Sequence, residues 1–403
     1  MRIGKKKLAI IILFVCIIIG GYVAYCLLRP INLTLAASHP KHVLITPGQS
    51  KLAWPNTGQA AVGIQGSNNV ETRGTITATQ TASVAKLITC LVVLKNKPLA
   101  LNEQGPSITL SPSDVAIYNS YVSEQGSVVA VVAGETITEY QMLQAVLLPS
   151  ANNIADSMAV WAYGSLPNYS TSANEYLAKS GLHDTHVGSD ASGYNPSTTS
   201  TAKDLVMLGK LAIQNPVIAQ IVSQPAATGI PQTTTVKNVN FLLGNNNING
   251  IKTGNTTQAG GVFVSSSYVI ENYKPITIVT AYAAAKDLSA ALHESLPLIT
   301  SAQKNFSTVS IVKAGDKVGM YELPWGGSVQ IISSGTISFN AWNDSPVIKD
   351  TSYKTIKSNS TTNTSTGTIT ASQKETVKSI SVNLKLKISI PKPTIWWRLI
   401  HPI

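Results

Sequence analysis

The first stretch of the chain is apolar without interruption. Leu8–Leu28 carries no charge. At about 1.5 Å per residue, a helix of this length reaches roughly 31 Å, enough to cross the hydrocarbon core of a bilayer. The basic residues Arg2 and Lys5–Lys7 precede it, and they favour a cytoplasmic N-terminus with the rest of the chain outside. We expect an uncleaved transmembrane anchor. The alternative is a signal peptide cleaved near Ala36-Ala37-Ser38.

A second apolar run, residues 83–94, has a different pattern. It is apolar on every side of a helical wheel, and Lys86 is its only charge. Such a pattern indicates a buried helix, and a buried lysine needs a partner or a purpose. Ser83 lies three positions earlier, about one turn away on the same helical face. The hydroxyl and the amine are therefore expected to meet.

The region up to residue 303 alternates between helical and strand patterns. The spacing of apolar residues, the helix-start signal at Ser111-Pro112 and the breaks at Pro and Gly predict most elements. Predicted helices lie near 111, at 140–148, 153–161, 201–213 and 286–304; predicted strands lie at 60–64, 261–265 and 276–282. This mixture indicates an α+β domain spanning residues 38–303.

From residue 304 onward the pattern changes to strands and turns. Residues 380–390 alternate strictly between apolar and polar, which predicts a strand with one buried face. The Ser/Thr/Asn-rich stretch 357–372 is expected to be a long loop. Pro391, Pro393 and Pro402 are expected to prevent a C-terminal amphipathic helix. We therefore predict three parts: a stub and anchor (1–37), an α+β domain (38–303) and a small β-sandwich (304–403).

Composition and charge narrow the function classes. Apolar residues make up 44% and charged residues only 12%, which suits a folded domain outside the cell. The net charge of +11 comes mostly from the basic N-terminus and from residues after Asp344, so the middle of the chain is close to neutral. Nucleic-acid binding is therefore disfavoured. Cys16, Cys26 and Cys90 do not form the pattern of a disulfide framework.

Three short motifs carry the candidate chemistry. They are Ser83-Val84-Ala85-Lys86, Ser150-Ala151-Asn152 and Lys252-Thr253-Gly254. A lone Ser-x-x-Lys arises by chance in many chains. Together and in this order, the motifs resemble those of the D-alanyl-D-alanine carboxypeptidases, the low-molecular-mass penicillin-binding proteins. Spacings of 67 and 102 residues between the motifs are also similar to that family.

The resemblance implies a fold and an activity. The fold is a transpeptidase/β-lactamase-like α+β domain, an antiparallel sheet flanked by helices, followed by a small β-sandwich. The activity is serine-type carboxypeptidase, removing the terminal D-alanine from peptidoglycan stem pentapeptides that end in D-Ala-D-Ala. β-Lactam antibiotics would acylate the same serine, and no cofactor or metal is expected.

The resemblance also assigns the catalytic roles. Ser83 would be the nucleophile and Lys86 its candidate base. An ordinary lysine has a pKa near ~10.4, so burial and a second cation, Lys252, are expected to lower the pKa of Lys86. Ser150 would pass a proton between Lys86 and the leaving amine. The backbone N–H groups of Ser83 and Asn255 would form the oxyanion hole.

The substrate-binding roles fall on the second and third motifs. Asn152 would hydrogen-bond a backbone amide of the peptide. Lys252 and Thr253 would meet its terminal carboxylate, and Gly254 would let the peptide lie along the strand edge.

Two rival functions stay open on the sequence. A class A-like β-lactamase would need a deacylating glutamate; Glu175 lies at a suitable spacing, but Lys179 stands where an asparagine is required. A non-catalytic peptidoglycan-binding scaffold on the same fold is the other rival. His183 and His186 have a metal-like spacing without a clear third ligand, so we expect ordinary loop histidines. Trp396-Trp397-Arg398 is expected either at a membrane interface or over the end of the β domain.

Overall fold

The computed structural model describes residues 4–35, 42–271, 274–373 and 376–402, and the chain divides into two compact units. Residues 50–305 form the central unit, and residues 1–49 with 306–403 form the terminal unit. The predicted domain boundary between residues 37 and 38 lies outside the described residues. The range 42–49 was expected in the α+β domain. It belongs instead to the terminal unit, because His42–Ile45 pairs with a strand of that unit.

The central unit is built on an antiparallel sheet in the order β11-β12-β13-β3-β4. Its strands are β3 (Gln59–Ile64), β4 (Val70–Arg73), β11 (Ile248–Thr256), β12 (Gly260–Glu271) and β13 (Lys274–Ala285). Short pairs flank it: β5 (Thr79–Gln80) with β8 (Thr199–Ser200), β6 (Ser107–Thr109) with β7 (Thr136–Thr138), and β9 (Ala226–Ala227) with β10 (Val236–Lys237). The strands predicted at 60–64, 261–265 and 276–282 are confirmed as parts of β3, β12 and β13.

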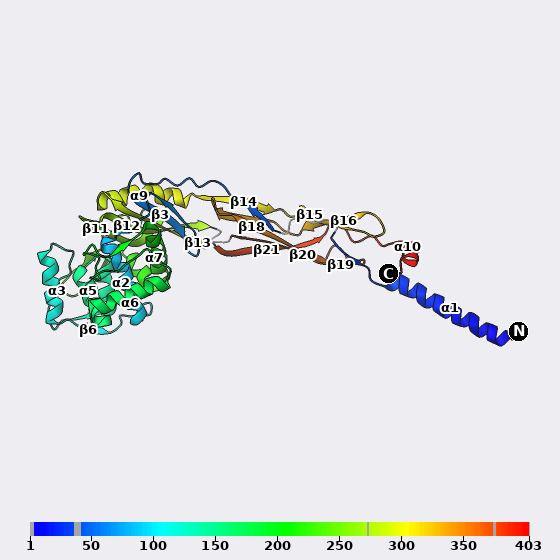
Figure 1. The fold of residues 1–403 in the computed structure, drawn as a ribbon, viewed down its shortest axis with the longest axis horizontal. Coiled ribbons are helices and arrows are strands. Elements are labelled where there is room, and N and C mark those ends of the chain that lie inside the picture. Colours follow the sequence, from blue (N-terminus) through cyan, green and yellow to red (C-terminus); the bar gives the residue numbers. More distant parts are fainter. Residues whose placement is uncertain (1–3, 36–41, 272–273, 374–375, 403) are drawn as a thin grey trace. The chain divides into compact units, whose positions relative to one another are not determined.

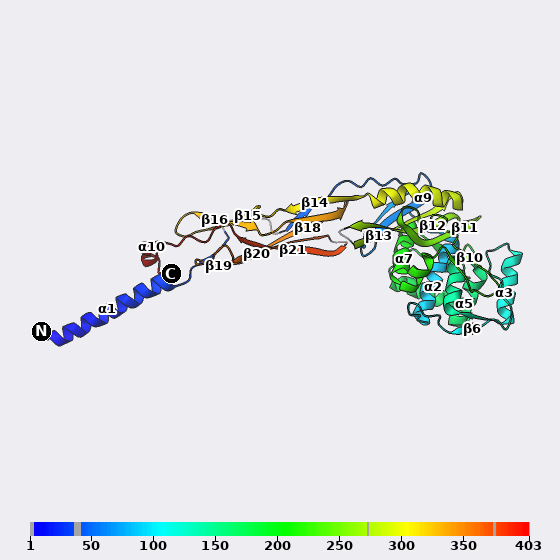
Figure 2. The ribbon, with the colours of Figure 1, turned by 180° about the vertical axis from the view of Figure 1, so that it is seen from behind.

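Helices cover both faces of this sheet (Figure 1), and the view from behind shows the same layers (Figure 2). They are α2 (Ala85–Asn96), α3 (Pro112–Ser123), α4 (Glu139–Leu147), α5 (Asn152–Tyr163), α6 (Leu166–Lys179), α7 (Ala202–Gln214), α8 (Pro216–Val222) and α9 (Leu288–Gln303). The 3-10 turns η1 (Ala82–Val84) and η2 (Asn245–Asn247) complete the unit. The predicted helices are confirmed, whereas α6 and α8 were not anticipated.

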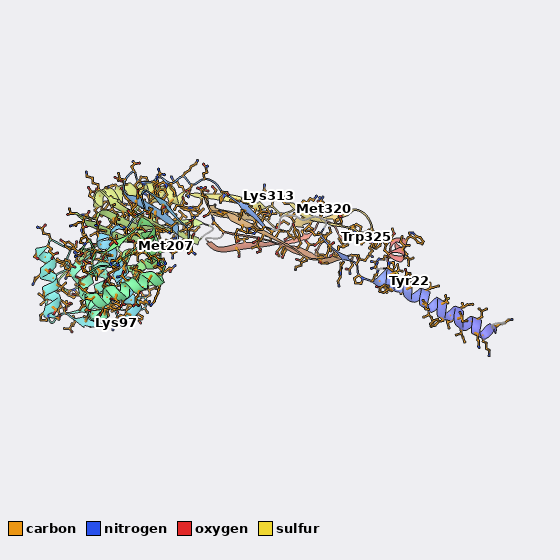
Figure 3. All side chains as sticks on the ribbon, in the orientation of Figure 1. Tyr22, Lys97, Met207, Lys313, Met320 and Trp325 are labelled. Carbon is orange, nitrogen blue, oxygen red and sulfur yellow. The ribbon has the colours of Figure 1, made fainter. Side chains whose placement is uncertain are left out.

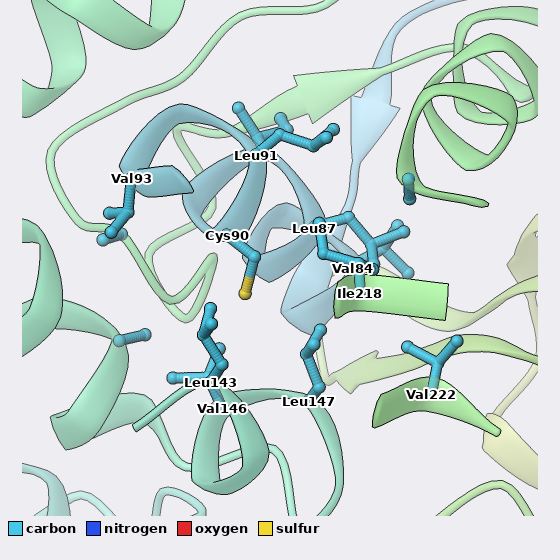
Figure 4. Close-up of a cluster of buried hydrophobic side chains, with 14 of the residues drawn as sticks. Val84, Leu87, Cys90, Leu91, Val93, Leu143, Val146, Leu147, Ile218 and Val222 are labelled. Atoms are coloured by element: carbon cyan, nitrogen blue, oxygen red, sulfur yellow. The ribbon is translucent and has the colours of Figure 1, made fainter. Parts of the chain in front are cut away.

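The sheet separates two hydrophobic cores because successive strand residues point to opposite faces. Along β12, Val262 and Val264 join the core shared with α2, α4, α5 and α7, while Phe263 joins the core under α9. The first core surrounds α2. Figure 4 shows Leu87 and Cys90 of α2 facing Leu147 of α4, as the all-round apolar pattern predicted. This packing fixes the helix that begins just after Ser83.

The terminal unit is β-rich. Its larger antiparallel sheet has the order β15-β16-β21-β20-β18-β2, and β14 pairs with β17 in a second sheet. The strands are β1 (Asn32–Leu33), β2 (His42–Ile45), β14 (Phe306–Val312), β15 (Lys317–Glu322), β16 (Ser328–Ser333), β17 (Ile337–Trp342), β18 (Val347–Tyr353), β19 (Ile356–Lys357), β20 (Ser365–Gln373) and β21 (Thr376–Leu386). Residues from both sheets share one core, which fits the predicted sandwich.

Two expectations for this unit need correction. The Ser/Thr-rich stretch predicted as a loop contains β20, in which Ile369 and Ala371 alternate with polar residues and are fully buried. Side-chain composition concealed this alternation. The alternating strand β21 ends at Leu386, and Ile380 and Ile388, both expected on the buried face, are exposed, whereas Ile390 is buried.

The N-terminal run forms α1 (Lys5–Leu28), the one helix among the described residues that is long and apolar enough to cross a membrane. The chain also ends in a short helix, α10 (Ile395–Ile400), in the tail where the prolines predicted no amphipathic helix. The prolines flank this helix, and Thr394 caps it by accepting a hydrogen bond from the Trp397 N–H at 3.1 Å. Trp397 packs edge-on against Trp325 (labelled in Figure 3), which supports the predicted place over the β domain, and Trp396 is 71% exposed.

Candidate active site

Ser83 lies in η1, directly before α2. The turn is anchored by the Thr81 N–H, which donates to the Thr198 carbonyl at 3.2 Å, and by the Val84 N–H, which donates to Thr81. Ser83 is half-buried, whereas the residues on either side of it are buried. Its hydroxyl therefore lies where the packed core meets the surface.

Lys86 is completely buried, and its ammonium group is surrounded by oxygen acceptors. Nζ lies 2.7 Å from Ser83 Oγ, 2.6 Å from Asn152 Oδ1 and 3.0 Å from the carbonyl oxygen of Ser192. The predicted contact between Ser83 and Lys86 is therefore present. A buried amine held beside a serine hydroxyl has the geometry of a base and its nucleophile.

The surroundings of Lys86 favour the neutral amine. Burial is the main cause, and the nearby cation of Lys252 adds to it; together they hold the pKa of Lys86 well below its usual value. The carboxylates of Asp190 and Asp156 act in the opposite direction. The second cation expected at Lys252 is thus in place.

The second motif forms the junction between α4 and α5. Ser150 has a φ of 67°, in the left-handed region, and its side chain is buried. The flanking backbone is held by the Ala151 N–H, which donates to Ala145, and by the Asn152 N–H, which donates to Ser127 at 2.7 Å. This sharp junction brings both polar side chains of the motif toward the first motif and β11.

The third motif lies on β11. Lys252 is 1% exposed, and its Nζ donates to Ser150 Oγ at 2.9 Å and to the Thr253 carbonyl at 3.1 Å. Burial lowers the pKa of Lys252 to about 7. Each lysine therefore donates to one side chain of the second motif: Lys86 to Asn152, and Lys252 to Ser150. The sequence had suggested Ser150 as the partner of Lys86.

Gly254 allows β11 to approach the Ser83 turn. A Cβ at this position would lie 2.9 Å from the Thr81 carbonyl oxygen and 3.1 Å from the Ser83 backbone nitrogen. Asn255, the next residue, is exposed at the end of the strand. The backbone groups expected to form an oxyanion hole thus lie on neighbouring segments.

A cavity of about 680 Å³ opens beside Asn255. Tyr121, Asp156, Asp190 and Tyr194 are among its lining residues. The charged residues that line it are all acidic, with Glu124 as the third. No sequence motif marks these residues, which come from α3, α5 and the segment 189–196.

The residues weighed for rival chemistry lie elsewhere. Glu175 forms an exposed i,i+4 ion pair with Lys179 at 3.5 Å on α6, which gives it no deacylating partner of the β-lactamase kind. The backbone of His186 bridges to Thr199. Among the described residues, no group of three or more His, Cys, Asp or Glu side chains is arranged to hold a metal ion.

Sequence comparison agrees with the geometry. The family model described as D-alanyl-D-alanine carboxypeptidase matches residues 66–283, more than half of the chain. D-alanyl-D-alanine carboxypeptidase DacD of Salmonella typhimurium is 28% identical over 271 residues, 63% of this chain and 64% of its own length. DacA of Escherichia coli is 27% identical over 61% of this chain and 60% of its own length. The chain thus aligns with less than two thirds of these relatives.

Solved structures share the fold. Penicillin-binding protein 5 of Haemophilus influenzae superposes with a TM-score of 0.57 at 20% identity, over 86% of this chain and all of its own. PBP3 of Streptococcus pneumoniae, described as a peptidoglycan synthesis regulatory factor, gives a TM-score of 0.59 at 18% identity, over 84% and 100%. With the motifs assembled in one site and the family model spanning them, the chain belongs to the D-alanyl-D-alanine carboxypeptidase family.

Proposed function

We propose that this protein is a serine-type D-Ala-D-Ala carboxypeptidase acting on peptidoglycan stem pentapeptides. The observation that supports this proposal most directly is the 2.7 Å contact between Lys86 Nζ and Ser83 Oγ. The lysine is completely buried, and its pKa is held well below the usual value. Neither rival function requires this arrangement together with a C-terminal β-rich unit.

In the acylation step, neutral Lys86 accepts the Ser83 proton while Oγ attacks the carbonyl carbon of the D-Ala-D-Ala bond. Negative charge develops on the carbonyl oxygen, and the backbone N–H groups of Ser83 and Asn255 stabilise it. The C–N bond then breaks, and the departing amine of D-alanine takes the proton. We propose that the Ser150 hydroxyl, which accepts from Lys252 Nζ at 2.9 Å, passes this proton from Lys86 to the amine.

Water completes the cycle. It attacks the ester carbon of the acyl-enzyme and gives a proton to Lys86. The C–O bond to Ser83 then breaks, Lys86 returns the proton to Ser83 Oγ, and the shortened peptide leaves. Lys252 in its charged form and Thr253 hold the terminal carboxylate of the substrate. The side-chain NH₂ of Asn152 is available for the substrate because its oxygen already accepts from Lys86.

The location we propose follows from α1. The helix crosses the cell membrane once, the basic residues before it stay in the cytoplasm, and the central unit acts outside on wall peptides.

The test is intact-mass analysis after incubation with benzylpenicillin, together with release of D-alanine from a pentapeptide. We expect a stable adduct of one penicillin on the wild type, none on Ser83→Ala, and D-alanine release that requires both Ser83 and Lys86. Rapid destruction of penicillin without an adduct would indicate a lactamase. Intact penicillin, no adduct and no released D-alanine would indicate a scaffold.

A further inference from the structure

A buried carboxylate that belongs to none of the three motifs lies behind Lys86. Asp156 is on α5, one helical turn after Asn152, and is 5% exposed. A charged side chain with so little exposure is costly unless its environment compensates it. A carboxylate buried close enough to act on the charge of Lys86 calls for a physical reason.

Each carboxylate oxygen of Asp156 accepts one hydrogen bond. Its Oδ1 accepts the Ala191 N–H at 2.8 Å, and its Oδ2 accepts the Tyr121 hydroxyl at 2.7 Å. The residue after Ala191 is Ser192, whose carbonyl oxygen accepts from Lys86 Nζ at 3.0 Å. Asp156 thus fixes the backbone that supplies one acceptor to the ammonium, and Asn152 on the same helix supplies another.

The network continues on the far side of this segment. Ser192 Oγ lies 3.1 Å from the Tyr121 hydroxyl and donates to Asp190 Oδ2 at 2.7 Å. Asp190 Oδ2 also accepts the backbone N–H groups of Tyr194 and Asn195, at 2.9 and 3.1 Å. Residues 190–195 are therefore linked to α5 through the Asp156 carboxylate and to α3 through the Tyr121 hydroxyl.

We propose that Asp156 is a positioning residue for Lys86: it holds the Ser192 carbonyl on the ammonium, and its negative charge sets the pH at which Lys86 becomes a base. This proposal rests on the proposed function. It assigns a role in proton transfer to a side chain outside the three motifs.

The charges around the two groups support this role. Lys86 faces Lys252 on β11, Asp156 on α5, Asp190 in the segment 189–196 and the Cys90 thiol on its own helix. The two carboxylates oppose burial and the cation of Lys252, with a smaller contribution from Cys90 in the same direction. Removing one of them leaves the ammonium less stable, so the lysine loses its proton at a lower pH.

The carboxylate can carry its charge in the working pH range. Burial raises the pKa of Asp156 to about 6, while the hydrogen bond from Tyr121 counteracts part of this effect. Asp190 and Lys86 act on it with opposite signs, and Tyr169 on α6 also faces it. At neutral pH Asp156 is therefore mostly ionised.

The experiment is the pH profile of Ser83 acylation by a fluorescent penicillin, measured on the full chain. Asp156→Asn keeps an oxygen for Ala191, and its NH₂ can donate to the Tyr121 oxygen, so the charge changes while the shape is kept. We expect the acidic limb of the profile to move to lower pH by roughly 0.5–1.5 units. Tyr121→Phe retains the carboxylate but weakens its ionisation, and we expect a smaller shift in the same direction.

Asp204→Asn is the matched control. Asp204 is a buried carboxylate in the same unit, accepting from Thr185 Oγ1 at 2.9 Å and from the Asp184 N–H at 3.0 Å, and it has no contact with the motifs. Its profile should match the wild type. If Asp156→Asn lowers the melting temperature by more than about 10 °C, Tyr121→Phe decides the question.

An unshifted acidic limb in the deciding variant overturns the proposal, whatever the height of the plateau. A wild type that is not acylated at any pH would instead overturn the proposed function itself. The two failures are therefore distinct.

Discussion

At the scale of residues, the missing side chain of Gly254 allows β11 to lie against the Ser83 turn. Gly254→Ala places a methyl group 2.9 Å from the Thr81 carbonyl, and backbone there has little freedom to move. We expect β11 to shift away from Ser83 and acylation to slow about 10- to 100-fold, while the fold is retained. The measurement is the second-order rate constant with a fluorescent penicillin.

Gly335→Ala is the control for this substitution. It adds a methyl group in the terminal unit, where the nearest atom is a side-chain methyl of Val382 at 3.3 Å. Acylation rates should stay at the wild-type value. A Gly254→Ala enzyme as fast as this control would contradict the steric argument.

Residue by residue, the sequence identified the motif side chains but not all of their partners. The contact between Ser83 and Lys86 followed from helical spacing alone. That Lys252 pairs with Ser150 did not, since it depends on the left-handed turn at Ser150. Asp156 gave no signal, because α5 carries other polar residues, such as Asn153 and Ser157, and Asp156 does not stand out among them.

At the scale of elements, α4 begins with Glu139, a glutamate whose charged form is disfavoured by burial. Glu139 is 1% exposed, its Oε1 is buried without a hydrogen-bond partner, and burial raises its pKa to about 7. A carboxyl group with a raised pKa stabilises the fold fully only below its unfolded-state pKa. We expect the free energy of unfolding to fall between pH ~4.5 and ~7, by on the order of 2–3 kcal/mol.

Glu139→Gln should remove this pH dependence, so that its free energy of unfolding exceeds that of the wild type at pH 8 and not at pH 4.5. Urea unfolding at both pH values measures the difference. Glu103→Gln, which neutralises an exposed carboxylate, should behave as the wild type does. Parallel losses in wild type and Glu139→Gln would exclude Glu139 as the cause.

Most elements of the central unit could be predicted because their apolar periodicity and capping residues are local. Ser111, for example, forms a capping box with Asp114, as the Ser-Pro signal indicated. β20 could not be recognised, since its inward positions include Gly367 and Gln373 and so do not form an apolar alternation against the Ser and Thr of the other face. α10 was missed because six residues between prolines give no helical period, and its cap at Thr394 is the only local signal.

At the scale of the whole molecule, α1 is separable from the chemistry. We expect a chain lacking residues 1–29 to appear in the soluble fraction, while the full chain stays in membranes after alkaline carbonate washing. Penicillin acylation rates should agree within about twofold, because every motif lies in the central unit. Recovery of the shortened chain in membranes would point to a second anchor, for which the exposed Trp396 is the first candidate.

The pairing of β2 with β18 has a consequence during synthesis of the chain. His42 lies opposite Asp350, so a strand that emerges early from the ribosome has no partner until almost the whole chain has been made. Most of the sequence between them is the central unit, which can complete its own sheet first. A premature stop before β18 would therefore leave an unpaired strand close behind the membrane helix, a template for aggregation rather than a merely shorter enzyme.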